Sequence, residues 1–134
     1  MATQILMEVM LSTNTMGAPI LVTGFEPFGG HQTNISGLVA SAVSGENVRG
    51  HVIRSLVLPV DYHGATTVSK MLDTEKFAAI IHIGLAEKSP FPRIETRARD
   101  VLDFRIPDNS GREIKNSNIT GKGDLYSTIK VEDW

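Results

Sequence analysis

A short apolar run near the middle of the chain restricts the fold more than any other feature. The residues from Phe77 to Ile83 read Phe-Ala-Ala-Ile-Ile-His-Ile, and Gly84 follows them. A run of this length with no polar face is typical of a strand in a parallel sheet that is covered on both sides. We therefore expect a central strand here, buried on both faces.

Strand-like and helix-like segments alternate on the amino-terminal side of this run. The spacing predicts a short strand at 20–22, a helix at 34–43, a strand at 51–58 that Pro59 stops, and a helix at 62–72. Asn34 or Ser36 could cap the first of these helices. Alternation of this kind predicts an α/β fold with a largely parallel sheet.

The two ends of the chain are less regular. Residues 94–104 alternate charged and apolar side chains, which predicts a strand at the sheet margin, and the chain then loses periodicity from Arg105 until Leu125. Residues 1–18 carry no Lys or Arg, unlike a signal peptide. We expect 1–18 to be an extension outside the fold, with Met16 as a possible start, and 19–134 to form the domain.

Composition excludes several classes of function. The net charge is -2 and the 13 Lys and Arg form no dense run, so a nucleic-acid partner is not expected. The chain has no Cys, which rules out disulfides and thiolate metal sites and fits a cytoplasmic location. No apolar run approaches the ~20 residues of a membrane helix. The four His show no metal-binding spacing, and we expect no metal or cofactor.

A glycine-rich loop, Gly24 to Gly30, follows the first predicted strand. In open parallel sheets, ligands bind beyond the carboxyl ends of the strands, so this loop is well placed for function. Its glycine spacing fits neither a dinucleotide-binding loop nor a P-loop. Phe25 and Phe28 flank Pro27 and could form an apolar slot for a flat, uncharged ligand. Alternatively, both rings only fill the core.

Five blocks of sequence occur in order along the chain: Thr23 to Gly30, Asn34 with Ser36, Leu58 to Val60, Ile81 to Ala86 and Arg105 to Asn109. Together they resemble one enzyme family, pyroglutamyl peptidase I, whose members are cysteine peptidases that remove an N-terminal pyroglutamate from peptides. The resemblance runs from about Ile20 to the end of the chain. It implies a three-layer α/β/α sandwich with a mixed, largely parallel sheet, of which this chain is the amino-terminal portion, incomplete at its carboxyl end.

The resemblance also implies a site. Phe25 and Phe28 correspond to residues that line the pyroglutamate pocket of the family, and the backbone groups of Leu85 and Ile106 would hold the lactam. Glu95 corresponds to the acid of a Cys, His and Glu triad, whose other two members lie further downstream in the family. Without the resemblance, Glu95 reads as a solvated acid that pairs with Arg97 or Arg99.

The missing nucleophile decides what activity we expect. A chain without Cys and without a matching downstream His should not hydrolyse a pyroglutamyl peptide by itself. Two explanations stay open: an incomplete enzyme, or a shortened pseudoenzyme that binds a pyroglutamyl or other small capped ligand.

The family also implies a possible homo-oligomer. Departures from its pattern include Ile35, Leu85 and the pair Glu87-Lys88, and His31 is the one His near the loop that merits a test.

Overall fold

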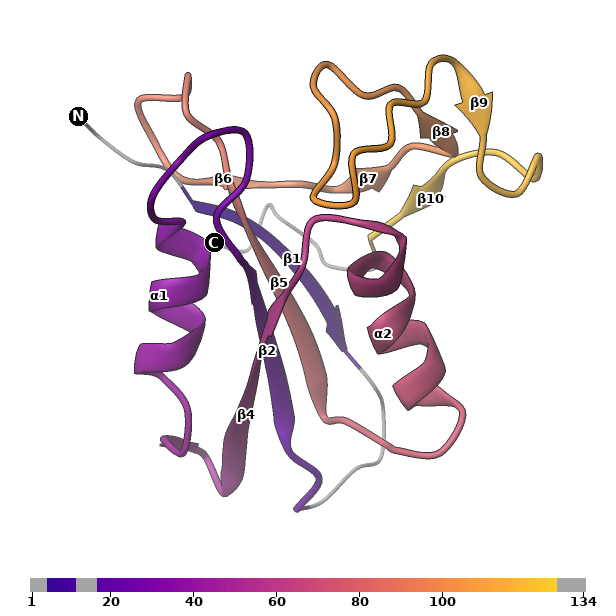
Figure 1. Ribbon diagram of the computed structural model, residues 1–134. Coiled ribbons are helices and arrows are strands. Elements are labelled where there is room, and N and C mark those ends of the chain that lie inside the picture. The colour runs from indigo at the N-terminus through magenta and orange to yellow at the C-terminus, as the bar shows by residue number, and fades with distance from the viewer. Residues whose placement is uncertain (1–4, 12–16, 128–134) are drawn as a thin grey trace.

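The computed structural model describes residues 5–11 and 17–127, and for 5–11 it describes the backbone alone. Its main element is a six-stranded sheet flanked by two helices (Figure 1). In chain order the elements are β1 (Ile5–Leu11), β2 (Ile20–Phe25), α1 (Ile35–Ala42), β3 (Asn47–Val48), β4 (His51–Leu58), α2 (Tyr62–Leu72), β5 (Ala79–Leu85), β6 (Arg93–Ile94), β7 (Arg97–Ala98), β8 (Val101–Leu102), β9 (Ser117–Asn118) and β10 (Leu125–Tyr126).

The sheet is mixed and mostly parallel, with the strand order β3-β4-β2-β5-β1-β6. The three central strands, β4, β2 and β5, run parallel to one another, and β6 runs parallel to β1. The edge strand β3 and the amino-terminal β1 are antiparallel to β4 and β5. The predicted α/β class is therefore confirmed, and β4 and α2 have the bounds that the sequence predicted.

The sheet is covered on both faces, which makes the fold a three-layer α/β/α sandwich. Successive side chains of a strand point to opposite faces. Accordingly, Leu21 of β2 packs in a cluster with Val68 of α2, whereas the next residue, Val22, packs in a second cluster with Ala40 of α1. Figure 1 shows α1 and α2 on opposite sides of the strands. Ile80 and Ile83 of β5 divide between the same two clusters, as expected for a central strand.

Short polar side chains begin both helices. Asn34 precedes α1 and accepts a hydrogen bond from the backbone N–H of Ser36 at 3.1 Å, and Asp61 precedes α2 and accepts one from that of Gly64 at 2.9 Å. Each satisfies a backbone donor that a helix start leaves unpaired. Both helices begin at the end of the sheet where β2 and β4 finish, so their caps lie next to the loops that follow these strands.

The prediction that residues 1–18 lie outside the fold is wrong for Ile5–Leu11. This segment forms β1, which pairs with β5 along seven residues, from Ile5 opposite Leu85 to Leu11 opposite Ala79. The physical reason is that a sheet edge carries unpaired N–H and C=O groups, and an extended segment of the same chain can satisfy them. The sequence showed an apolar run there but not which strand it would pair with.

The segment that begins at β6 folds differently from the predicted marginal strand. Only Arg93–Ile94 joins the main sheet, while β7 pairs with β10 and β8 pairs with β9 in two small antiparallel sheets. Figure 1 shows these four strands gathered at the end of the main sheet where β2 and β5 finish. We call residues 93–127 the carboxyl-terminal arm. In the part of the chain that the structure describes, no helix is long and apolar enough to cross a membrane.

Candidate functional site

The strand order creates a crevice at the carboxyl ends of β2 and β5. The chain leaves β2 and returns as β4 on one side of it, then crosses back and returns as β5 on the other side. The connections after β2 and β5 therefore lead away in opposite directions. Such a topological switch point is where open α/β sheets bind their ligands.

An open cavity of about 1070 Å³ occupies this position. It is enclosed by the loops after β2, β4 and β5 and by the carboxyl-terminal arm. Four of the five residues that the sequence analysis singled out line it: Phe25, Phe28, Leu85 and Ile106. The remaining lining residues are His31, Pro59, Val60, Asp61, Ala65, Ala86, Glu87, Lys88, Ser89, Pro90, Arg93, Leu102, Phe104, Arg105, Pro107 and Asp108.

The wall that follows β2 is held by a buried pair of polar residues. The hydroxyl of Ser36, which is fully buried, accepts a hydrogen bond from the backbone N–H of Phe25 at 3.0 Å. The amide of Asn34 donates to the carbonyl of Glu26 at 3.1 Å, and its oxygen accepts from the Ser36 hydroxyl at 2.8 Å. Gly24 permits the close approach, because a Cβ there would lie 2.1 Å from the Ser36 carbonyl oxygen. The first loop is thus bonded directly to the start of α1.

The opposite wall, residues 105–109, is fixed against two other loops. The backbone N–H of Asn109 donates to the carbonyl of Val60 at 2.8 Å, and its side-chain amide donates to the carbonyl of Pro27 at 3.4 Å. The side chain of Ile106 lies directly over Gly29, where a Cβ would be 2.6 Å from the Ile106 Cδ1. Ile106 and Phe28 therefore reach the cavity from adjacent backbone segments.

Asp108 organises the turn that ends this wall. Its carboxylate accepts hydrogen bonds from the backbone N–H groups of Ser110 (3.0 Å) and Arg112 (2.9 Å), and it forms an ion pair with the Arg112 guanidinium at 2.9 Å. The side chain is only 4% exposed. Burial opposes the charged form, but the hydrogen bonds from Ser110 and Arg112 prevail and lower the pKa of Asp108 from 3.8 to about 2.

A close contact between His31 and Glu87 joins the two loops at the switch point. The Nε2 of His31, after β2, lies 2.6 Å from an oxygen of Glu87, after β5. The ring of Phe28 meets the His31 ring edge to face, with 6.3 Å between the ring centroids. His31 therefore connects a cavity-lining aromatic ring to the neighbouring loop. Sequence reasoning noted His31 beside the loop and Glu87 as a departure from the family, but nothing in their spacing predicted that they meet.

Glu95 does not line the cavity. Its carboxylate lies 3.5 Å from the guanidinium of Arg93, which does line it, and its side chain is 43% exposed. The alternative predicted for Glu95 named Arg97 or Arg99 as its ion-pair partner, but Arg97 instead pairs with Asp124. The structure therefore brings four of the expected site residues together in one cavity. Glu95 lies outside it and is linked to it through Arg93.

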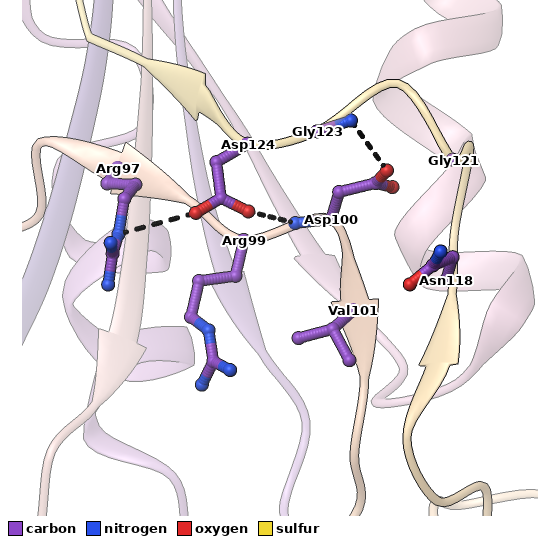
Figure 2. A pocket seen from close by; sticks show the side chains of 8 residues that line it. All are labelled: Arg97, Arg99, Asp100, Val101, Asn118, Gly121, Gly123 and Asp124. Atoms are coloured by element: carbon purple, nitrogen blue, oxygen red, sulfur yellow. Dashed lines mark hydrogen bonds and ion pairs between the residues drawn. The ribbon is translucent and has the colours of Figure 1, made fainter.

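A second pocket, of about 530 Å³, lies within the carboxyl-terminal arm (Figure 2). Asp124 accepts the backbone N–H of Asp100 at 2.8 Å, and Asp100 in turn accepts those of Thr120 at 2.7 Å and Gly123 at 3.0 Å. These hydrogen bonds hold the pKa of Asp100 below its usual 3.8. Both carboxylates are occupied in tying β7 and β8 to the segment from β9 to β10, so we assign this pocket a structural role.

Two further observations concern histidine and metal. The Nδ1 of His82 lies 2.7 Å from the hydroxyl of Thr23, which is fully buried, so His82 is hydrogen-bonded within the sheet. Within the described residues, no three His, Asp or Glu side chains are grouped so that they could hold a metal ion.

Comparisons with known proteins bear on this site. The model of the pyroglutamyl peptidase family matches residues 18–133. The pyrrolidone-carboxylate peptidase of Pyrococcus furiosus is 39% identical over 116 residues, and that of Coprothermobacter proteolyticus is 34% identical over the same length. Each match covers 84% of this chain and 56% of the relative, so the chain spans little more than half the length of these relatives.

Comparison with solved structures agrees with these sequence matches. The crystal structure of pyrrolidone carboxyl peptidase from Thermus thermophilus matches with a TM-score of 0.70 and 33% identity, over 85% of this chain and 60% of that one. The corresponding protein from Pyrococcus furiosus matches with a TM-score of 0.65 and 27% identity, over 86% of this chain and 57% of that one. The family match, the identities and the shared fold all agree, and this chain belongs to the pyroglutamyl peptidase family.

Proposed function

We propose that the cavity at the switch point binds the pyroglutamyl residue at the amino terminus of a peptide. The relatives are named pyrrolidone-carboxylate peptidases, and pyrrolidone carboxylate is the cyclised form of glutamate. The observation that carries the proposal is the convergence of Phe25, Phe28, Leu85 and Ile106, from three separate segments of the chain, on one cavity.

The chemistry of the cavity suits a lactam. A pyroglutamyl ring is flat and uncharged, with one N–H donor and one carbonyl acceptor, so it needs apolar walls and a few polar backbone groups. Phe25 and Phe28 supply aromatic surface. The backbone N–H and C=O of Ile106 form no hydrogen bond to any residue that the structure describes, which leaves both free to pair with the lactam.

We further propose that these 134 residues bind such a peptide without cleaving it. Hydrolysis by a cysteine peptidase needs a thiolate to attack the acyl carbonyl and a histidine to transfer the proton. The sequence contains no Cys. Glu95 would then orient a histidine that belongs to the rest of a full-length enzyme, a positioning role for which its place beside the cavity wall is suitable. The alternative that the sequence left open, a shortened pseudoenzyme that binds the ligand, would use the same cavity and would not need a nucleophile.

Binding is tested by calorimetric titration of the chain with pyroglutamyl-alanine amide, with prolyl-alanine amide as the comparison. Prolyl peptides carry a charged ring nitrogen and no ring carbonyl, so we expect them to bind much more weakly. We expect Phe28→Ala to weaken pyroglutamyl binding about tenfold or more, the scale of a lost aromatic contact. Phe91→Ala is the matched control, because Phe91 is 73% exposed and does not line the cavity. Equal binding of both peptides, or equal effects of both substitutions, would overturn the proposal.

Cleavage is tested separately with a chromogenic pyroglutamyl amide. Loss of the nucleophile from a hydrolytic triad costs about 10⁶ in turnover, so we expect no release of the chromophore above the rate in buffer. Turnover by this chain would show that a residue other than cysteine acts as the nucleophile.

A further inference from the structure

We propose that the cavity selects peptides with a carboxylate directly after the pyroglutamyl residue, and that Lys88, together with Arg105, recognises it. This inference rests on the proposed function and narrows its substrate class. Two sources share the chemistry: an Asp or Glu side chain at the second position, and the terminal carboxylate of a pyroglutamyl dipeptide.

The size of the cavity leaves room for this second group. At about 1070 Å³ the cavity is slightly larger than the range of about 300–1000 Å³ that is typical of pockets for a drug-sized ligand. A five-membered lactam fills only a part of such a space. The residue that follows the lactam therefore lies within reach of the remaining lining side chains.

The acidic side chains of the lining are all engaged. Glu87 pairs with His31, Asp61 caps the start of α2 through Gly64, and Asp108 accepts from Ser110 and Arg112. Each of these carboxylates therefore already has a partner within the fold.

The basic side chains of the lining are not all engaged. Arg93 pairs with Glu95, but Lys88 and Arg105 form no hydrogen bond or ion pair with any residue that the structure describes. Two cations without a partner are available to pair with an anionic group in the ligand. Lys88 stands three residues after β5 and Arg105 lies next to Ile106, so the cations approach from two different walls.

The test is a calorimetric comparison of four ligands. Pyroglutamyl-alanine amide is neutral, pyroglutamyl-glutamate amide carries a side-chain carboxylate, pyroglutamyl-alanine carries a terminal carboxylate, and pyroglutamyl-lysine amide carries a cation. We expect both carboxylate ligands to bind about three- to tenfold more tightly than the neutral amide, and the lysine ligand to bind more weakly. The advantage should shrink in about 0.5 M salt, because salt screens exposed charges. A preference for only one of the two carboxylate ligands shows whether the recognised group is a side-chain or a terminal carboxylate, and it still supports the proposal.

Lys88→Gln should remove most of this advantage, measured as the ratio of the affinities for a carboxylate ligand and for the neutral amide. Lys76→Gln is the matched control, because Lys76 is exposed and precedes β5, whereas Lys88 follows β5 at the opposite end of the sheet. Equal affinities for the neutral and carboxylate ligands would overturn this inference and leave the proposed function standing. If no pyroglutamyl ligand binds, the proposed function and the inference both fail.

Discussion

The buried hydroxyl of Ser36 links the first loop to the start of α1. It is fully buried, it is hydrogen-bonded to Asn34, and it accepts the backbone N–H of Phe25 at the point where β2 ends. Deleting it leaves a buried backbone donor without an acceptor, which is more costly than the loss of an exposed hydrogen bond. The position of a cavity-lining ring thus depends on one hydroxyl beneath it.

We expect Ser36→Ala to lower the free energy of unfolding by about 1–3 kcal/mol, the usual penalty for an unsatisfied buried donor. Ser41→Ala is the control, since Ser41 is an exposed residue of the same helix and should change stability little. Urea denaturation followed by circular dichroism measures both. Equal effects would mean that the Ser36 hydroxyl does not hold the first loop.

Glu95 allows a second test at the scale of single residues. Because its carboxylate is outside the cavity and bonded to Arg93, Glu95→Gln should change the affinity for pyroglutamyl-alanine amide by less than about twofold, a difference of about 0.4 kcal/mol. Calorimetric titration beside Phe28→Ala provides the comparison. A loss as large as that of Phe28→Ala would place Glu95 in contact with the ligand.

At the scale of elements, sequence patterns identified the segments that local periodicity defines. The bounds of β4 and α2 were predicted, and the helix predicted at 34–43 is α1. Local patterns did not specify long-range partners. The alternation at 94–104 predicted a strand at the sheet margin, which is wrong for most of the segment. The strands β7 and β8 pair instead with β10 and β9, which come much later in the chain, so local alternation could not indicate this pairing.

In the candidate site too, sequence patterns indicated some residues but not the long-range contacts between loops. Phe25 and Phe28 could be named because their loop follows a strand at the carboxyl end of a parallel sheet, where ligands bind. Leu85 and Ile106 could be named only from the family resemblance. The contact between His31 and Glu87 joins two loops whose conformations no periodicity describes, so no pattern in the sequence indicated it. The turn at Asp108 had a visible signal, the Asp-Asn-Ser-Gly run, which is typical of side-chain-capped turns.

The carboxylates of the carboxyl-terminal arm predict how stability changes at low pH. The pKa of Asp108 is lowered to about 2 in the folded chain, against 3.8 for the free carboxyl, so its contribution to stability is present above pH 4 and is lost as pH falls toward 2. The pKa of Asp100 is lowered in the same direction. We expect melting temperatures to fall from pH 4 to pH 2, and the fall to be smaller in Asp108→Asn. Asp103→Asn, at an exposed position in the same arm, is the control for the loss of one carboxylate.

At the scale of the whole molecule, β1 extends the sheet beyond the part that matches the family. The family match begins at residue 18, yet Ile5–Leu11 pairs with the full length of β5 and also contacts β6. A chain that begins at Met16 would leave the β5 edge unpaired, and unpaired edges favour association with other chains. The amino-terminal segment is therefore expected to matter for stability and for oligomeric state.

We expect the chain that begins at Met16 to melt at a lower temperature than the full 134 residues and to show more oligomer by light scattering. Circular dichroism gives the melting temperature of each form at the same concentration. Identical melting and scattering of the two forms would show that β1 does not stabilise the sheet.

The central claim, that a pyroglutamyl ring binds between β2, β5 and the carboxyl-terminal arm, is tested most directly by nuclear magnetic resonance. The isotope-labelled chain is titrated with pyroglutamyl-alanine amide, and the perturbed resonances are assigned. We expect saturable shifts at Phe25, Phe28, Leu85 and Ile106. Shifts confined to the second pocket around Arg99 and Asp124, or no saturable shift at all, would contradict the claim.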